Sequence, residues 1–241
     1  MVNLLMDLLF PQRMCCICQQ PGMYSTRQPW CPSCDDKLIE LQHVHLICDR
    51  CGKYLAEDCG SSLCKDCKNR TPPFELSRAV GPYEEPYRIA IKVLKFMGRK
   101  HLAYRMGKMM AEVVKNEPRF WPIDMIIPVP STRASIKQRG FNQTEVLGCQ
   151  ISKELKIKMY CNLLVRVKET PSQRECSREE REKNLLQAFA VNNADCIKGK
   201  NILLVDDVFT TGSTSRECAR TLLDHGAGKV KVITWATGKG Y

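Results

Sequence analysis

The segment from Val205 to Thr214 combines two adjacent carboxylates with a run of hydroxyl side chains around one glycine. Asn201 to Val205 is apolar and rich in branched residues, which predicts a short buried strand that ends at the acids. Apolar residues at helical spacing follow and stop before Gly226, which predicts a helix with a glycine just beyond its end. The residues that could do chemistry would therefore lie between a strand and a helix.

Such a loop suits a sugar phosphate. Backbone N–H groups at a helix N-terminus point at one spot, and the helix dipole makes that spot positive. Gly212 allows close approach of the backbone, hydroxyls can donate to phosphate oxygens, and carboxylates can accept from sugar hydroxyls. A capped helix beside two solvated acids is the plainer alternative, but capping requires neither the acids nor Thr-Thr-Gly at this spacing. The residues expected to hold the ligand are Asp206, Asp207, Thr210, Thr211, Gly212, Ser213 and Thr214.

Cysteines form a second pattern, because ten of the 15 lie before residue 70. Four Cys-x2-Cys pairs follow one another, and two such pairs complete a tetrahedral four-thiolate zinc site. Chain order predicts one zinc ion on the first two pairs and a second on the last two, although an interleaved pairing stays open. Cys16 and Cys59 fall outside the spacing, and Cys59 is the better substitute ligand. Closed four-thiolate sites leave no open position, so we expect two structural Zn²⁺ ions that fold a segment too small for its own core. The expected ligands are Cys15, Cys18, Cys31, Cys34, Cys48, Cys51, Cys64 and Cys67.

Composition constrains the partners and the compartment. A chain of 241 residues can hold one medium domain and a small module, and its formal net charge of +11 favours a polyanionic partner, nucleic acid first. Met1 to Phe10 is apolar but lacks a basic flank and a cleavage site, and it is too short to span a bilayer. We expect it to form an amphipathic helix on the following module, with no membrane span. A reducing cytoplasm suits the clustered thiols best.

The elements that would position these residues divide at Thr71-Pro72-Pro73. We expect residues 1–72 to form the N-terminal helix and a double zinc-finger module, and residues 78–241 to form a larger domain. Strands expected at 79–83, 123–129, 201–205 and 229–235 alternate with helices, which predicts an α/β fold with a mainly parallel sheet flanked by helices. Ligands of such sheets bind at the carboxyl ends of the strands.

A long helical pattern follows Pro86 and is broken at Gly98. Its methionine-rich face is expected to be core. Its other face is basic and has two interpretations: a solvated surface, which we favour, or a stripe that contacts phosphates. The basic residues are Lys92, Lys95, Arg99, Lys100, Arg105 and Lys108.

The acid and hydroxyl segment resembles the 5-phosphoribosyl diphosphate (PRPP) loop of type I phosphoribosyltransferases. That pattern is an apolar strand, two acids, two variable residues, Thr-Thr-Gly, one variable residue and Thr, and every fixed position is matched here. Pro128-Val129-Pro130, a basic stretch and Arg139-Gly140-Phe141-Asn142-Gln143 are similar to the ComF proteins, which include ComFC and GntX. Lys95-Phe96-x-Gly98-Arg99 and the N-terminal four-cysteine finger resemble the same family, whereas Cys176 stands where the family usually has Leu. The flexible loop of the ComF family and the strand after that loop are matched here by Arg166, Thr170, Gln173, Arg181, Asn184 and Ala188-Phe189.

This resemblance implies a type I phosphoribosyltransferase domain that binds PRPP with Mg²⁺. It implies that Asp206 and Asp207 face the ribose as the catalytic pair, and that the Pro-Val-Pro turn forms the diphosphate side. The cations of that loop are what a diphosphate requires. The charged segment 166–184 suits a mobile lid, with a disordered surface hairpin as the alternative. The residues expected on the diphosphate side are Pro130, Ser131, Arg133 and Arg139.

Three functions compete. The favoured one is a ComF-type protein of DNA uptake, natural transformation or DNA utilisation, with PRPP, single-stranded DNA and other DNA-uptake or recombination proteins as partners. The second is a metabolic phosphoribosyltransferase that transfers phosphoribosyl to a nitrogen nucleophile, and the third is a zinc adaptor with a degenerate fold. The intact loop argues against the third, and no nucleobase hood is recognisable for the second. Trp30 is expected to cover the first zinc site, with base stacking as the alternative.

Overall fold

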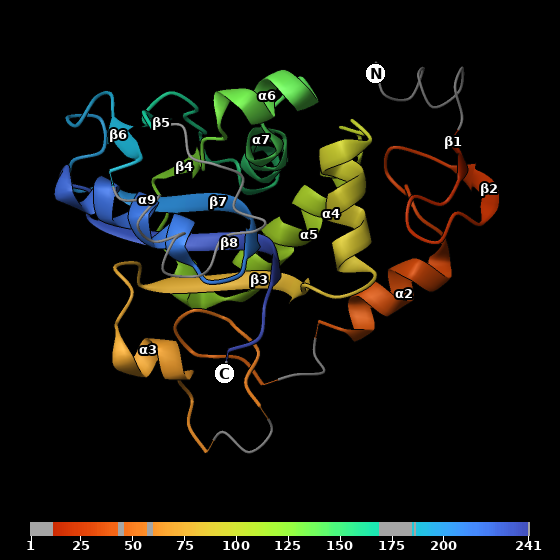
Figure 1. The fold of residues 1–241 in the computed structure, drawn as a ribbon, viewed down its shortest axis with the longest axis horizontal. Coiled ribbons are helices and arrows are strands. Elements are labelled where there is room, and N and C mark those ends of the chain that lie inside the picture. Colours follow the sequence, from red (N-terminus) through yellow and green to blue (C-terminus); the bar gives the residue numbers. More distant parts are fainter. Residues whose placement is uncertain (1–11, 43–45, 57–59, 169–184, 186, 241) are drawn as a thin grey trace.

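A computed structural model of the chain describes residues 12–42, 46–56, 60–168, 185 and 187–240 (Figure 1). Four strands form the main sheet, and every neighbouring pair in it is parallel. The expected α/β fold with a mainly parallel sheet flanked by helices is therefore confirmed. In spatial order the strands are β3 (Leu76–Pro82), β8 (Lys229–Thr237), β7 (Asn201–Phe209) and β4 (Met125–Pro128).

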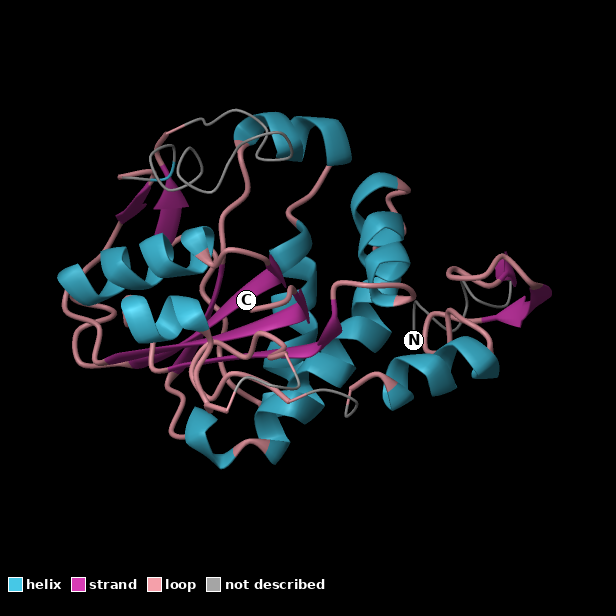
Figure 2. Ribbon diagram, turned by 60° about the horizontal axis from the view of Figure 1, so that its bottom comes forward, coloured by secondary structure: helices cyan, strands magenta, loops and turns pink. Residues whose placement is uncertain are grey.

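The central strands are buried on both faces, because successive residues of a strand point to opposite sides of the sheet. On β7, Leu203 and Val205 belong to one buried cluster, whereas Ile202 and Leu204 belong to the other. Helices lie on both sides of the central strands (Figure 2), which explains why β7 reads as a continuous apolar run. The helices of the first cluster are α4 (Tyr87–Phe96), α5 (Leu102–Asn116) and α7 (Gln143–Leu155), and that of the second is α9 (Ser213–Asp224).

Strand β7 continues beyond its expected end at Val205 to Phe209. Its ladder with β8 pairs Asp206 with Thr234 and Phe209 with Thr237. The two acids therefore belong to the strand itself, because β8 also continues to Thr237 and supplies backbone partners that far. The side chains of the acids are thus held by a paired backbone and not by a free loop.

The methionine-rich helical pattern forms α4 and α5, and Gly98 lies between them with φ +63°. Met106, Met109 and Met110 are at most 3% exposed and join the first cluster. The prediction that this face is core is confirmed.

The cysteine-rich segment contacts both cores. Its first half lies beside α4 and its second half lies below β3 (Figure 1). Trp30 and Leu38 join the first cluster, whereas Leu55 and Phe74 join the second. The helix expected over Met1–Phe10 and the candidate ligand Cys59 lie outside the described residues. The elements of this segment are β1 (Gln12–Met14), β2 (Pro21–Tyr24), α2 (Pro32–Glu40) and α3 (Lys65–Asn69).

Shorter elements complete the described part: η1 (Pro118–Phe120), α6 (Arg133–Arg139), β5 (Leu164–Arg166) and β6 (Phe189–Val191). Strands β5 and β6 pair antiparallel. Residues 169–184 of the expected lid lie outside the described residues. Within the described ranges, no helix is both long enough and apolar enough to cross a membrane.

Candidate functional site

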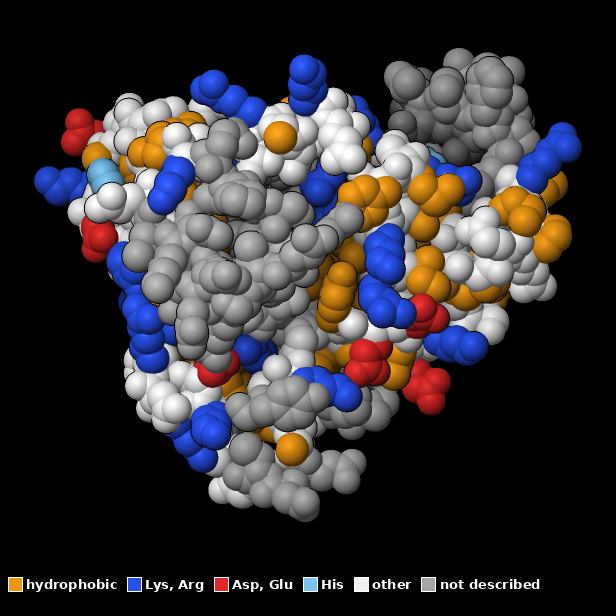
Figure 3. All heavy atoms as spheres, viewed as in Figure 1, with side chains coloured by type: hydrophobic (Ala, Val, Ile, Leu, Met, Phe, Trp, Pro, Cys, Tyr) orange, Lys and Arg blue, Asp and Glu red, His pale blue; other side chains and the backbone are white. Residues whose placement is uncertain are grey.

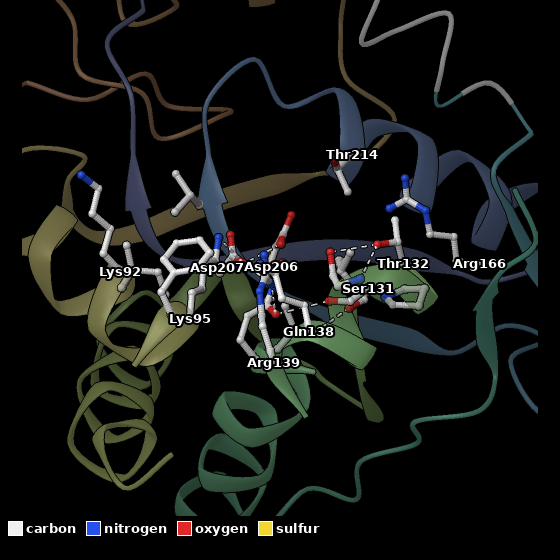
Figure 4. A pocket seen from close by; sticks show the side chains of 18 of the residues that line it. Lys92, Lys95, Ser131, Thr132, Gln138, Arg139, Arg166, Asp206, Asp207 and Thr214 are labelled. Carbon is white, nitrogen blue, oxygen red and sulfur yellow. Dashed lines mark hydrogen bonds and ion pairs between the residues drawn. The ribbon is translucent and has the colours of Figure 1, made fainter. Parts of the chain in front are cut away.

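A cavity of about 940 Å³ opens at the carboxyl ends of β4 and β7, where ligands of parallel sheets bind. Its walls come from α4, α6, the turn after β4 and the loop after β7. Along the view of Figure 4, the lysines of α4 lie at one end and the two acids in the middle. At the other end lie Ser131, Thr132, Thr214 and Arg166. The cavity therefore has a sequence of chemically different zones along its length.

Asp206 and Asp207 lie in the cavity wall and are 8% and 7% exposed. The backbone N–H of Asp207 donates to Oδ1 of Asp206 at 2.8 Å. Burial, together with the adjacent charge of Asp207, raises the pKa of Asp206 to about 7. Near neutral pH, Asp206 therefore holds a proton much more readily than an exposed aspartate does.

Asp207 is held by a chain of polar contacts that joins α4 to α7. Lys95 Nζ lies 2.7 Å from Asp207 Oδ2, and Gln143 Nε2 donates to the same oxygen at 2.6 Å. Gln143 Oε1 in turn accepts from Arg139 Nη1 at 2.8 Å. Because both ends of the amide are engaged, its N–H group is directed at the carboxylate. Lys95 and Gln143 are absent from the predicted ligand-binding set, although both lie in segments whose likeness to ComF proteins is visible in the sequence.

The hydroxyl loop contributes two of its side chains to the cavity lining, those of Thr210 and Thr214. Thr211 and Ser213 are not among the lining residues, and their hydroxyls lie 2.8 Å from each other inside the turn. Gly212, which also lies outside the lining, has φ +76°, and a Cβ there would lie 2.4 Å from the Phe209 ring. Thr211, Gly212 and Ser213 thus build the turn that presents the other two.

The turn after β4 and helix α6 supply the opposite wall. Of the four residues expected on the diphosphate side, Pro130, Ser131 and Arg139 line the cavity, whereas Arg133 is exposed and lies outside the lining. The reason is helical periodicity, because a helix that directs Ser135 and Arg139 toward the cavity directs Arg133 elsewhere. Arg139 is therefore the α6 arginine that can reach a ligand in this cavity.

Arg166, at the end of β5, lines the far end of the cavity. Its guanidinium carbon lies 5.4 Å from the centre of the Phe189 ring on β6. The base of the expected lid thus brings one cation to the cavity.

The basic residues of α4 and α5 do not form one solvated face. Lys95 pairs with Asp207, Arg99 Nη1 lies 3.3 Å from Cys16 Sγ, and Arg105 Nη2 lies 2.9 Å from both oxygens of Asp35. The favoured interpretation of a solvated face is therefore wrong for these three residues. Lys92 and Lys100 are exposed, and on the face shown in Figure 3 the Lys and Arg side chains are scattered among other residues.

The cysteines form two compact sets in chain order. Within each set, the four sulfur atoms all lie within 4.8 Å of one another. Zinc–sulfur bonds of about 2.3 Å in a tetrahedron place sulfur atoms about 3.8 Å apart, and the sulfur–sulfur distances of Cys15–Cys34 and Cys18–Cys31 are 3.9 and 3.6 Å. Both sets therefore fit zinc, and the chain-order pairing is the one found. The sets are Cys15, Cys18, Cys31 and Cys34, and Cys48, Cys51, Cys64 and Cys67.

The two sets repeat one local structure, which the sequence analysis missed. Cys48 follows Cys15 by 33 positions (48 − 15), and the same offset separates every other pair of equivalent ligands. In each set the third cysteine directly precedes a helix, as its N-cap, with nearly identical extended backbone angles, φ −71° and ψ 160° at Cys31 and φ −69° and ψ 160° at Cys64. The N–H of that third cysteine approaches the first sulfur at 3.3 Å in both sets. Comparison of the cysteine spacings alone could have shown the repeat.

Trp30 is 0% exposed, and its ring centre lies 6.4 Å from that of Trp235. Its indole Nε1 donates to Asp35 Oδ1 at 2.7 Å. A fully buried indole cannot stack on bases, so the alternative role for Trp30 is wrong and the packing role beside the first cysteine set is confirmed.

Comparison with known families agrees with these two kinds of site. Residues 5–72 match the model of the double zinc ribbon domain, and residues 145–240 match that of the phosphoribosyl transferase domain. The chain is 29% identical over 224 residues to competence protein F of Haemophilus influenzae, which covers 90% of this chain and 94% of that protein. It is 31% identical over 189 residues to the DNA utilization protein YhgH of Salmonella typhimurium, which covers 77% of this chain and 82% of that protein. Identity to competence protein ComFC of Bacillus subtilis is 23% over 204 residues, covering 81% of this chain and 78% of that protein. The chain belongs to the ComF family, in which a double zinc ribbon precedes a type I phosphoribosyltransferase fold.

Proposed function

We propose that the cavity binds PRPP together with Mg²⁺, and that the protein uses this site in DNA uptake or DNA utilisation. One observation carries the proposal: the acids of β7, the hydroxyl loop before α9 and the turn after β4 line a single cavity. Each of these parts suits a different part of PRPP.

In the proposed binding mode, the 5-phosphate lies against Thr210, Thr214 and the start of α9, where hydroxyl and backbone donors and the helix dipole favour an anion. The ribose hydroxyls face Asp206 and Asp207. The diphosphate lies on the side of Ser131 and Arg139. We assign this last contact to Arg139 instead of Arg133, because Arg139 lines the cavity.

The residues at the acid pair fit Mg²⁺. This ion takes oxygen ligands, and it is usually bound through one or two carboxylates plus the phosphates of a substrate. Asp206 and Asp207 bring carboxylate oxygens to the cavity, and PRPP would bring the rest. Once bound, the ion would neutralise charge on the diphosphate.

Isothermal titration of the purified protein with PRPP in Mg²⁺ tests the proposal. Wild type should bind, the double change Asp206→Asn with Asp207→Asn should weaken binding strongly, and Thr211→Ala should weaken it less. Thr211 is the matched control because it lies in the same loop but outside the cavity lining. Absence of PRPP binding by the wild type would refute the proposed ligand.

For the biological role we rely on the names of the relatives, which are a competence protein and a DNA utilization protein. We propose that this chain acts in the cytoplasm, where its thiols stay reduced, together with single-stranded DNA and other DNA-uptake or recombination proteins. The net charge of +11 supports a polyanionic partner. Contacts to phosphates would make the affinity fall steeply with salt and depend little on sequence.

The geometry of the basic helices decides how DNA binding should be tested. Exchanging Lys95, Arg99 or Arg105 would break internal contacts, so the informative variant is Lys92→Ala with Lys100→Ala, at two exposed positions. Fluorescence anisotropy of single-stranded and duplex oligonucleotides, measured against salt, should show a single-strand preference that weakens in this variant. If the wild type binds no oligonucleotide at low salt, the proposed DNA partner is refuted, while the proposed PRPP site is unaffected.

A second candidate function, transfer of phosphoribosyl to a planar nitrogen nucleophile, is favoured by one specific observation. The α4 end of the cavity is lined by Tyr83, Ile91 and Phe96, an apolar wall next to the acids. Such a wall can pack against the face of a planar ring. Release of diphosphate from PRPP in the presence of nucleobases would support transfer, and its absence with ammonia and nucleobases alike would favour a binding role alone.

A further inference from the structure

Lys95 forms an ion pair with one of the two acids in the cavity wall. The side chain comes from the last turn of α4 and is 19% exposed, and its ammonium nitrogen lies 2.7 Å from Asp207 Oδ2. Figure 4 shows Lys95 reaching the acids, whereas Lys92, one turn earlier on the same helix, points away from them. One lysine of the pair is thus directed at the carboxylates and the other is not.

The remaining contacts of Asp207 hold it in this arrangement. Gln143 donates to the same oxygen that Lys95 contacts, at 2.6 Å, and Arg139 fixes the far end of the Gln143 amide. Asp207 Oδ2 therefore has two donors from two different helices. Adjacent Asp206 shares no ion pair in the described part of the chain, and its Oδ1 accepts from the Asp207 backbone. Among the described residues, Asp207 thus has an ion-pair partner at 2.7 Å and Asp206 has none.

We propose that Lys95 is a built-in counter-ion that prevents the free acid pair from binding a divalent metal, so that metal enters the site only together with the diphosphate of the substrate. This inference rests on the proposed function, because it concerns the same acids. Two adjacent carboxylates without a cation would attract a divalent ion by themselves. With the ammonium in place, the ion meets a smaller net negative charge and a nearby positive one. Lys95 is accordingly a positioning and specificity residue, and it is not assigned a chemical step.

Binding of Mn²⁺ alone, without PRPP, tests the role of Lys95. We would measure it by the loss of the free-ion signal in electron paramagnetic resonance, at a pH above 7 so that Asp206 can ionise. Wild type should bind Mn²⁺ weakly, and Lys95→Met should bind it at least about tenfold more tightly, because a positive charge beside the ion has been removed. Lys95→Gln, which keeps a donor for Asp207, should behave like Lys95→Met, whereas Lys95→Arg should behave like wild type.

Lys92→Met is the matched control, since it removes the same charge from the same helix and cavity. Its Mn²⁺ affinity should stay within a few-fold of wild type. If neither Lys95→Met nor Lys95→Gln binds Mn²⁺ more tightly than wild type, or if Lys92→Met gains as much, the inference is wrong. Circular dichroism and zinc content identify a variant that fails to fold, and the two substitutions at Lys95 keep the test decisive if one of them does.

The same titrations separate this inference from the proposed function. A wild type that fails to bind PRPP in Mg²⁺ refutes the proposed ligand, whatever Mn²⁺ does alone. A wild type that binds PRPP in Mg²⁺, together with a Lys95→Met variant that does not gain Mn²⁺ affinity, retains the proposed function and overturns the role of Lys95.

Discussion

Replacing Asp206 by Asn should stabilise the protein, and more so at high pH. Asp206 is 8% exposed and lies beside Asp207, so its ionised form is disfavoured in the folded state. Burial, followed by the neighbouring charge, raises its pKa from 3.8 to about 7. At about 1.4 kcal/mol for each tenfold change in the proton equilibrium, the ionised carboxylate costs up to about 4 kcal/mol of stability.

The sign follows from proton binding. Between pH 3.8 and about 7, the folded protein binds the Asp206 proton more tightly than the unfolded chain does, so the free energy of unfolding falls as pH rises. This loss is complete above the folded pKa and absent below the unfolded one. Asparagine does not titrate, so the advantage of Asp206→Asn over wild type should grow by about 2–3 kcal/mol between about pH 5 and pH 8.

Urea unfolding followed by tryptophan fluorescence, with zinc present and both proteins compared at each pH, measures this difference. Asp124→Asn serves as a control of opposite sign, because hydrogen bonding by the Asn201 backbone lowers the pKa of Asp124. Its loss of stability should be larger at high pH. If the advantage of Asp206→Asn is the same at both pH values, ionised Asp206 is not costly and the reasoning fails. The same variant should lose PRPP affinity, because the acid whose ionised form destabilises the fold is part of the proposed site.

Three further outcomes are expected. Gly212→Ala should lower the free energy of unfolding by about 2 kcal/mol or more, measured by thermal or urea unfolding, because the backbone there has a left-handed φ and the new Cβ would collide with the Phe209 ring. Gly199→Ala is the control and should cost less, because Gly199 also has a positive φ, +69°, but open space around it. Removing either partner of the Arg105–Asp35 pair should cost about 1–3 kcal/mol, and a double-mutant cycle that shows no coupling would contradict a stabilising contact from Arg105 Nη2 to the two carboxylate oxygens. Elemental analysis should find about two zinc ions per chain, and chelation should lower the melting temperature; less than one ion, with thiols that react freely, would contradict the sites.

Local sequence signals predicted the elements that are defined by short-range chemistry. The apolar run before Asp206, the glycine at position 212 and the paired cysteines each impose a backbone geometry on their neighbours. The start of the strand, the turn and both thiolate sets therefore follow from local sequence patterns. The strand end at Val205 was placed too early because the ladder partner of the acids, Thr234 on β8, is distant in sequence.

The contacts of the cavity depend on residues that the sequence separates widely. Lys95, Gln143 and Asp207 come from two helices and a strand, and only the packing of α4 and α7 on the same face of the sheet brings them together. Helical spacing assigned Lys95 to a polar face, but it could not show that this face meets a carboxylate. The exclusion of Arg133 from the lining has a similar cause, since it depends on how α6 is rotated about its axis.

The cysteine sets are built into opposite faces of one sheet. The first shares a buried cluster with Trp235, whose ring centre lies 6.4 Å from that of Trp30. The second shares a cluster with Phe209, whose ring meets Phe74 edge-on at 5.9 Å. A zinc site that closes part of a shared core stabilises both the ribbon and the sheet, because neither ribbon has enough apolar surface to form a core alone.

The second set also connects to the loop that would bind PRPP. Phe209 ends β7 beneath Gly212, and its carbonyl accepts from the N–H of Gly238 at 2.9 Å. Two residues later, the N–H of Gly240 donates to the carbonyl of Tyr54, which lies between the second and third ligands of this set. The chain after β8 thus joins the zinc ribbon to the floor of the loop by backbone hydrogen bonds. Loss of zinc from the second set should therefore destabilise the loop of Thr210 and Thr214 as well as the ribbon itself. The first set contacts the opposite face of the sheet, toward α4 and α5, so loss of its zinc should affect this loop less.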